Sequence, residues 1–287
     1  MTHRRDAGSP GGAAGGTWDS ALPAGEFAAV KGVGFEPVGQ VLGTAVFNIG
    51  YEGLWGCPGA WTVTDGVKKP SPPMGSSFAP MVGTLYAARR LALARAVAEC
   101  RALGGDGIVG VDLRVDRFTS HTVEFTVLGT AVRARSRIRP RAPFTSHLRG
   151  QDFAKLLNAG WVPTGLAFGI AMETRHDDWS TLQSSWTAGN QEVEGYTQLI
   201  SRARQGARKQ LAIDVAKHGA DGVVVDEVEL TVHGRECPGV GGIGGGAYAR
   251  DCIAEAVFVG TSIARFGRSR RPAGPEPLTI MRLEREH

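Results

Sequence analysis

The chain has 287 residues, of which 42% are hydrophobic and 21% are charged, and its net charge is +4. This length allows one large or two ordinary domains, and no run of about 18 apolar residues occurs, so the composition excludes a membrane-spanning or a wholly disordered protein. Glycine is unusually frequent, with 41 residues, which predicts many turns and close backbone approaches.

Both ends of the chain differ in composition from its middle. Residues 1–21 are rich in glycine, alanine and serine and lack the apolar stretch of a secretory signal, so we expect a disordered tail and a cytoplasmic protein. Residues 267–287 mix arginine with proline and predict a basic flexible tail. The chain has four cysteines, which without an export signal are typical of free thiols in a reducing compartment.

The most informative feature of the sequence is an internal repeat. Three stretches of the first half recur in the second half at offsets of 126, 115 and 131, which are residues 27–45 with 153–171, 105–109 with 220–224, and 128–132 with 259–263. The changes of offset place extra residues before the first long helix and in the last hairpin of the second copy. The two copies therefore share a core and differ in their loops.

Each copy predicts the same order of elements. For the first copy we expect a short helix over 25–32, strands over 38–48, 108–115 and 123–133, and a long helix over 81–103. For the second copy we expect a short helix over 150–158, strands over 164–174, 223–232 and 253–264, and a long helix over 192–218. Pro37 and Pro163 open the first strands, where a residue without an N–H is tolerated.

The long helices are predicted from apolar residues that recur at steps of three and four. These stripes consist of Met81, Leu85, Ala88, Ala92, Ala96 and Cys100 in the first copy, and of Tyr196, Ile200, Ala203, Ala207, Leu211 and Val215 in the second. Gly104 and Gly219 follow the helices, at the position where a left-handed residue commonly ends a helix.

The order of elements also predicts a topology. The long helix is a crossover, so the first and second strands should be parallel, and the second and third should form an antiparallel hairpin. The loops 50–80 and 175–191 and the hairpin tips 116–122 and 233–250 should then share one sheet edge, where α/β sheets tend to bind ligands. A three-stranded sheet with one long helix has a small core and exposed edges, so we expect oligomerisation.

The glycine motifs of both copies resemble those of the YbjQ-like family, known as putative heavy-metal-binding proteins. The resemblance lies in Gly105-Asp106-Gly107 followed by Gly129-Thr130, and it recurs in Asp221-Gly222 followed by Gly260-Thr261. It covers residues 22–135 and 144–266, with a basic linker over 136–143. It implies an α+β fold made of two dodecin-like β-α-β-β units, each with a short leading helix, and assembly into a homo-oligomeric ring, of five chains if it follows single-domain members.

A metal site is the sharpest functional hypothesis, with zinc or copper as the candidate soft metal, because such metals bind thiolate and imidazole groups that converge on one point. The candidate ligands are Cys57, Cys237, His176 and His233, which lie in or beside the predicted loops. Ordinary turn formation explains the Cys-Pro-Gly sequences at 57 and 237 about as well. Cys100 lies on the helical stripe and is interpreted as a core thiol.

Four tryptophans occupy corresponding loops of the two copies, namely Trp55, Trp61, Trp179 and Trp186. Clustered aromatic residues anchor apolar ligands and protein partners. The alternative is that these loops fold back over the helix or over the seam of a ring.

Other chemical motifs favour structural roles. The glycine-rich stretch 239–246 lacks the lysine and the following helix of a phosphate-binding loop, so a hairpin tip is expected. Cys237 and Cys252 flank this tip and form a candidate redox pair. The alternating arginines from Arg133 to Arg141 are interpreted as protection of a sheet edge, which makes nucleic-acid binding the weaker hypothesis.

Enzymatic activity finds little support, because Asp106 and Asp221 lie in turns and no nucleophile motif occurs. The sequence therefore predicts a non-enzymatic, ring-forming protein that binds a ligand at its loops. The alternative is a scaffold that binds no metal and holds an apolar molecule or a protein partner through its tryptophans. A hydrolase with a site between subunits is a distant third hypothesis.

Overall fold

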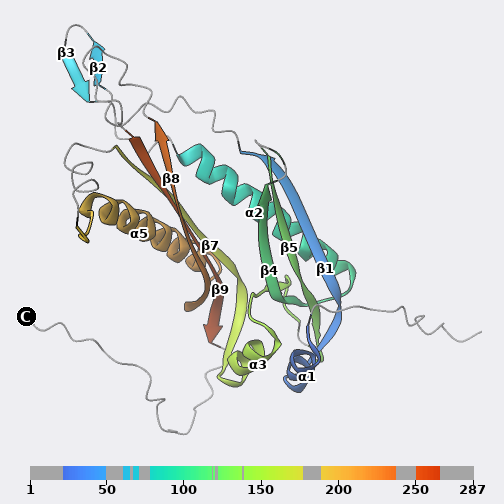
Figure 1. The fold of residues 1–287 in the computed structure, drawn as a ribbon. Coiled ribbons are helices and arrows are strands. Elements are labelled where there is room, and N and C mark those ends of the chain that lie inside the picture. Colours follow the sequence, from blue (N-terminus) through green and yellow to red (C-terminus); the bar gives the residue numbers. More distant parts are fainter. Residues whose placement is uncertain are drawn as a thin grey trace, which may run out of the picture.

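The structure is a computed structural model, and it describes residues 22–49, 61–64, 67–70, 78–117, 119, 122–137, 139–176, 189–236 and 250–265. The fold is mixed α+β, and the predicted order of elements is present in both copies (Figure 1). The described helices are all too short or too polar to cross a lipid bilayer.

The first copy contains α1 (Ala24–Gly32), β1 (Phe35–Asn48), α2 (Ala79–Ala102), β4 (Gly107–Arg117) and β5 (Thr122–Ala134). The second copy contains α3 (Gly150–Asn158), β7 (Trp161–His176), α5 (Glu194–Lys217), β8 (Gly222–Glu236) and β9 (Arg250–Arg265). Each element matches a predicted range to within a few residues at either end.

The first strands begin earlier than predicted. Pro37 and Pro163 do not open β1 and β7 but lie two residues inside them, each at a break in register before Gly39 or Gly165. A bulge accommodates a proline within a strand because the missing N–H falls where pairing is interrupted. The predicted starts at 38 and 164 were therefore three residues too late, because both strands continue through the bulge.

Three strands were not predicted. A hairpin of β2 (Trp61–Thr64) and β3 (Val67–Pro70) forms a separate two-stranded sheet within the first loop. The third is β6 (Phe144–Thr145), which lies between the two copies and pairs in parallel with β4. The described segment from Phe144 onward therefore connects the copies through backbone hydrogen bonds.

The strand order adds a detail that was not predicted. The first sheet has the order β1-β5-β4-β6 and the second has the order β7-β9-β8, so the last strand of each copy lies between the other two. The first and second strands of each copy do run in the same direction, as predicted, but both pair with the last strand and not with each other. Asn48 is opposite Thr122, so the loops leave from one edge of the sheet.

The long helices bury the predicted stripe of small residues. Ala88, Ala92, Ala96 and Cys100 of α2 have no exposed surface, and the same is true of Ala203 and Ala207 of α5. Met81, Tyr196 and Ile200 are only half-buried, whereas Leu199 takes part in the core. Both helices end before glycines in the left-handed conformation, Gly104 at φ 70° and Gly219 at φ 61°.

The two copies are packed against each other as layers. Helix α5 covers one face of the second sheet, and α2 lies between the first sheet and the opposite face of the second (Figure 1). This opposite face, which we call the α2-facing surface, consists of Leu166, Phe168, Ile170, Met172, Ile253, Val257 and Val259, all buried in one core with α2. Strands β7 and β9 are therefore covered on both faces, whereas β8 stays largely exposed.

Candidate functional site

Two adjoining cavities lie where the copies meet, one after the other along β4 and β8. One has a volume of about 840 Å³ and is lined by α1, β4, the segment 147–149 and β8. The other, of about 530 Å³, is lined by α2, β4, β8 and β9. Leu113, Glu227 and Val259 line both, so the cavities form one cleft along the junction of the two copies.

A buried arginine of α2 dominates the smaller cavity. Arg89 is only 3% exposed, its guanidinium lies 5.2 Å from the ring centre of Phe125, and its Nη1 donates to the carbonyl oxygen of Leu85 at 3.4 Å. Its Nε has no hydrogen-bond partner among the described residues. Burial lowers the pKa of Arg89, and the negative charges of Glu255, Glu229 and Glu227 oppose this shift.

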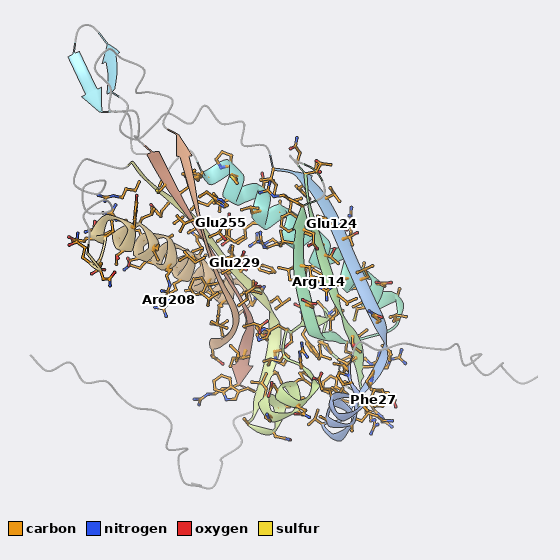
Figure 2. The ribbon with its side chains drawn as sticks, in the orientation of Figure 1. Phe27, Arg114, Glu124, Arg208, Glu229 and Glu255 are labelled. Carbon is orange, nitrogen blue, oxygen red and sulfur yellow. The ribbon has the colours of Figure 1, made fainter. Side chains whose placement is uncertain are left out.

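The facing carboxylates belong to the second copy. Glu255 of β9 and Glu229 of β8 (Figure 2) line the smaller cavity together with Arg89, as does Glu227 of β8. Burial raises the pKa of Glu255, and Arg89 opposes the shift; burial and the neighbouring Glu229 both raise the pKa of Glu227. The smaller cavity is thus lined by opposite charges. Helix α2 of the first copy supplies the cation, and the second sheet supplies the anions.

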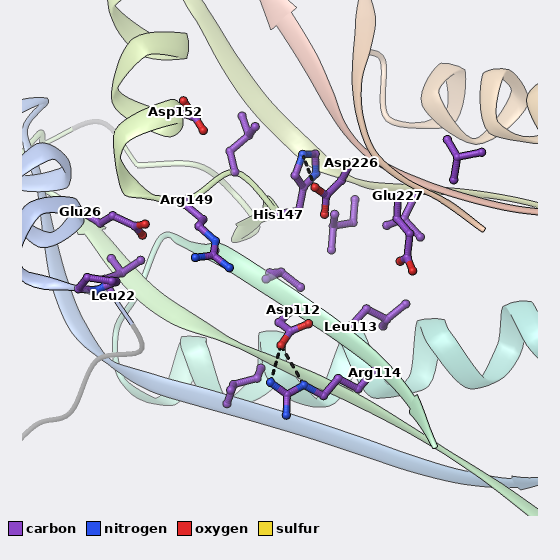
Figure 3. A pocket seen from close by; sticks show the side chains of 18 residues that line it. Leu22, Glu26, Asp112, Leu113, Arg114, His147, Arg149, Asp152, Asp226 and Glu227 are labelled. Carbon is purple, nitrogen blue, oxygen red and sulfur yellow. Dashed lines mark hydrogen bonds and ion pairs between the residues drawn. The ribbon is translucent and has the colours of Figure 1, made fainter. Parts of the chain in front are cut away.

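The larger cavity contains a buried histidine on the segment that joins the copies. The Nδ1 of His147 lies 2.8 Å from the hydroxyl oxygen of Thr261, which also accepts a hydrogen bond from the His147 backbone N–H at 3.1 Å. The Nε2 of His147 lies 3.9 Å from the carboxylate of Asp226 on β8 (Figure 3). Burial lowers the pKa of His147, and Asp226 partly offsets this effect.

The line Thr261, His147, Asp226 has the residue types of a nucleophile, a base and an acid. The hydroxyl-bearing residue, however, has no exposed surface, so a substrate could not reach its oxygen. Thr261 instead ties the linking segment to β9, and Ser146 adds a second contact to it at 3.2 Å. This arrangement holds the two copies together and does not resemble an accessible catalytic triad.

The glycine and aspartate motifs lie where the long helices return to the sheets. The Asp106 carboxylate accepts a hydrogen bond from Ala134 N–H at 2.8 Å, and Asp221 accepts one from Arg265 N–H at 2.9 Å. Gly129 and Gly260 face the neighbouring strand so closely that a Cβ would come within 2.6 Å and 2.7 Å of it. Thr130 is fully buried at the position that corresponds to Thr261.

Most of the predicted metal and aromatic residues lie outside the described part. Cys57, Cys237, Trp55, Trp179 and Trp186 are in undescribed loops, and only the backbone of Trp61 in β2 and His176 in β7 is described. His233 lies on β8 and lines the smaller cavity. The described ranges contain no group of three histidine, cysteine or acidic side chains that could hold a metal.

Three further cysteine and arginine predictions have different outcomes. Burial raises the pKa of Cys100 to about 11, as expected for a core thiol. Cys252 is half-buried on β9, and its proposed redox partner lies outside the described residues. Arg133 donates to the carbonyl oxygens of Leu103 and Gly104, both at 2.8 Å, and so caps the C-terminus of α2, a role the sequence analysis did not foresee.

Arg89, Glu255 and His147 were not predicted from the sequence. Arg89 recurs as Arg204 at the offset of 115, and Glu255 recurs as Glu124 at the offset of 131. A comparison of charged residues between the copies, in addition to glycines, would have singled out this pair. His147 has no charged or aromatic counterpart in the repeat and could not have been found in this way.

Two comparisons with known proteins bear on the chain. The sequence model of the YbjQ family, described as "Putative heavy-metal-binding", matches residues 71–135, which span α2, β4 and β5. The encapsulin nanocompartment protein Rv1762c of Mycobacterium tuberculosis is 32% identical over 221 residues, which are 72% of this chain and 76% of that protein.

Proposed function

This chain belongs to the YbjQ-like family and to the same family as that mycobacterial protein, and from this premise we propose that it is a non-enzymatic protein that assembles head to tail with copies of itself. In the assembly, the first sheet of each chain receives α5 of a neighbouring chain, and the chains close into a ring. We propose further, from the name of the relative, that this ring is a component of an encapsulin nanocompartment.

The observation that carries this proposal is the packing of α2 between two sheets. Within one chain, α2 of the first copy covers the first sheet and also the α2-facing surface of the second copy. Because the copies are repeats, the same contact can continue at both ends of the chain, with α5 in the place of α2 and the first sheet in the place of the second. A contact of this kind is heterologous and leads to a ring when the rotation closes.

The receiving face on the first sheet carries two exposed apolar side chains among polar ones in the single chain. Leu42 and Val46 of β1 correspond to Phe168 and Met172 of β7. Phe168 and Met172 are 1% and 5% exposed beneath α2, whereas Leu42 and Val46 are 52% and 50% exposed. Covering these side chains would remove apolar surface from water, which favours association.

The charges at the two ends match those of the internal contact. Arg204 on α5 is exposed and corresponds to Arg89, and Glu124 on the outer face of the first sheet corresponds to Glu255 (Figure 2). Arg204 of one chain would therefore face Glu124 of the neighbouring chain. Arg114 takes the place of Glu229, but it is paired with Asp112 at 2.8 Å, so its charge is locally balanced.

Charge exchange tests this contact. We expect native mass spectrometry of the full chain to show a closed oligomer, and we expect Arg204→Glu and Glu124→Arg each to shift it to single chains, because each places like charges face to face. The double variant should restore the oligomer. Lys209→Glu carries the same charge change and is the control, since the corresponding Ala94 stays exposed even with α2 in place.

Two results would overturn the proposal. One is a wild-type chain that stays monomeric at every concentration measured. The other is an oligomer that survives both single charge reversals as well as it survives Lys209→Glu.

The loop edge supports a second element of the proposal, a ligand site on one side of the assembly. The ends of β1 and β4 and the start of β5 lie together, since Asn48 and Arg117 are opposite Thr122 and Val123. In the second copy, His176 and Glu236 are likewise opposite Asp251 and Arg250. A site there would combine loops of both copies, with either a soft metal or an apolar molecule as the ligand.

A further inference from the structure

The segment that links the copies completes the edge of the first sheet. Phe144 N–H donates to Asp106 O at 3.2 Å and Ser146 N–H to Ile108 O at 2.9 Å, while Ser146 O and Leu148 O each accept a backbone N–H of β4 at 3.0 Å. The register of this parallel pairing places Phe144 beside Gly107 and Thr145 beside Ile108. Residues 144–148, which we call the edge segment, thus cover the edge of β4, with Phe144–Thr145 as a short added strand.

The corresponding edge of the second sheet is open. Asp106 to Val109 of the first copy are all buried, whereas Asp221 is exposed and Gly222, Val223 and Val224 are only half-buried. Val225 is 43% exposed. Among the described residues, β8 pairs with β9 alone. The second copy therefore has the same strand without the segment that covers it in the first copy.

Two corresponding glycines show the shape of the missing piece. A Cβ on Gly107 would lie 2.3 Å from the ring of Phe144, so the ring fills the space above this glycine. A Cβ on Gly222 would meet nothing closer than Ile263 at 3.7 Å. The glycine is retained, but the aromatic ring that occupies its open face in the first copy has no described counterpart in the second.

The sequence contains a second edge segment, ahead of the other short helix. At the offset of 126, which relates α1 to α3, Trp18 corresponds to Phe144, Ser20 to Ser146 and Leu22 to Leu148. Leu22 is half-buried and packs near Gly110 of its own first copy. An aromatic residue, a serine and a leucine thus recur in the same spacing, directly before a short helix in both cases.

We propose that residues 18–22 of one chain add as a parallel strand to the open edge of β8 in a neighbouring chain, with Trp18 over Gly222. This inference rests on the head-to-tail assembly proposed above and assigns it a second contact. Both segments then follow one rule. Residues 144–148 lie directly before the short helix of the second copy and pair with β4 of the first copy, and residues 18–22 lie directly before the short helix of the first copy and would pair with β8 of the neighbouring chain. Backbone hydrogen bonds along an open edge supply affinity, and the ring over the glycine sets the register.

A disulfide tests the register directly. In a background with all four native cysteines replaced, Asp19→Cys and Val223→Cys should form a bond between chains, since this pair corresponds to Thr145 and Ile108. Non-reducing electrophoresis should shift most of the monomer band to dimers and larger species, and reduction should reverse the shift. The control joins Asp19→Cys with Val232→Cys, which lies much farther along β8 and should leave the monomer band in place.

Gly222→Val provides a test without cysteines. Its backbone is not in the left-handed region and its surroundings are open, so the single chain should fold as the wild type does. The added side chain occupies the place of the Trp18 ring, and we expect a loss of oligomer in native mass spectra with unchanged circular dichroism.

The outcomes separate this inference from the proposed assembly. An oligomer that depends on Arg204 and Glu124, but shows no specific disulfide and tolerates Gly222→Val, would overturn the inference and leave the assembly standing. A disulfide that forms within one chain would also overturn it, because the segment would then cover its own β8. A monomeric wild type would overturn both.

Discussion

At the scale of single residues, two glycines decide how closely the long helices approach their sheets. A Cβ on Gly43 would lie 2.1 Å from the carbonyl oxygen of Ala92, and a Cβ on Gly169 would lie 2.2 Å from that of Ala207. These glycines and the helical alanines were recognised in the sequence as a repeat. Their pairing was not, because a repeat shows that two positions correspond and not which positions touch.

We expect Gly43→Ala to lower the free energy of unfolding by about 1–3 kcal/mol, because the new methyl group has to displace a helix backbone. Gly83→Ala is the matched control. Gly83 lies within α2 with nothing within 4 Å of its Cβ position, so the same change should raise stability by about 0.5–1 kcal/mol through helix propensity. Urea denaturation followed by circular dichroism measures both values, and equal effects of the two changes would contradict the close approach.

His147 predicts a dependence of stability on pH. Its pKa is lowered in the folded chain from the ordinary value of 6.5, chiefly by burial, so the unfolded chain binds the proton more readily. The histidine's contribution to stability is therefore complete above pH 6.5 and is lost as the pH falls from there toward the folded pKa.

The variant His147→Asn isolates this contribution, because an amide can still reach Thr261 but does not titrate in this range. We expect the wild type to lose more stability than the variant between pH 7 and pH 5, compared at the same protein concentration. Parallel curves for the two proteins would show that His147 is not the group responsible.

At the scale of elements, the sequence predicted the helices and strands that the two repeats share, because the stripes of α2 and α5 and the terminating glycines are local signals. It did not predict β2, β3 or β6. The order of strands in the sheets depends on pairing between distant residues, so β5 and β9 could not be placed in the middle from local patterns. The edge segment was likewise taken only for the start of the second copy, since two residues of strand carry no readable period.

Of the candidate site, likewise, only the part that depends on local signals was predicted. The loops were correctly predicted to leave from one edge, because strand direction follows from the crossover helix. The cleft between the copies was not predicted, because its walls come from α2, β4, β8 and β9, which only packing brings together.

Helix α2 is anchored to the second copy by the hydroxyl group of Tyr86, next to an ion pair between Arg90 and Asp214 of α5 at 2.7 Å. The Tyr86 hydroxyl donates to Phe168 O at 3.3 Å and accepts from Ile170 N–H at 2.8 Å, on the outer edge of β7. We expect Tyr86→Phe to lower the free energy of unfolding by about 1–3 kcal/mol, because two backbone groups lose their partner. Thr84→Val, which removes a hydroxyl bonded within α2 only, should have a smaller effect in the same denaturation experiment.

At the scale of the whole molecule, a metal at the loop edge is separable from the assembly. If the loops bind zinc or copper, native mass spectra recorded with added metal should gain whole metal ions per chain, and Cys57→Ser with Cys237→Ser should lose them while keeping the oligomer. An oligomer of unchanged mass would favour the alternative, a scaffold that binds an apolar molecule or a protein through its tryptophans. Loss of the oligomer in the serine variant would show that the two properties are linked.

The fusion of two units in one chain makes successive joints of the proposed ring unequal. Inside the chain, α2 presents Tyr86 and Leu93 to the second sheet, whereas α5 has Ser201 and Arg208 at the corresponding positions. Every second joint is thus covalently tethered and largely apolar, and the joints between them are more polar, although they include Leu42 and Val46. A newly made chain can therefore stay in solution before it assembles, because its free ends are more polar than its internal joint. Such a ring would open only at the joints between chains. Its count of units is always even, whatever its size.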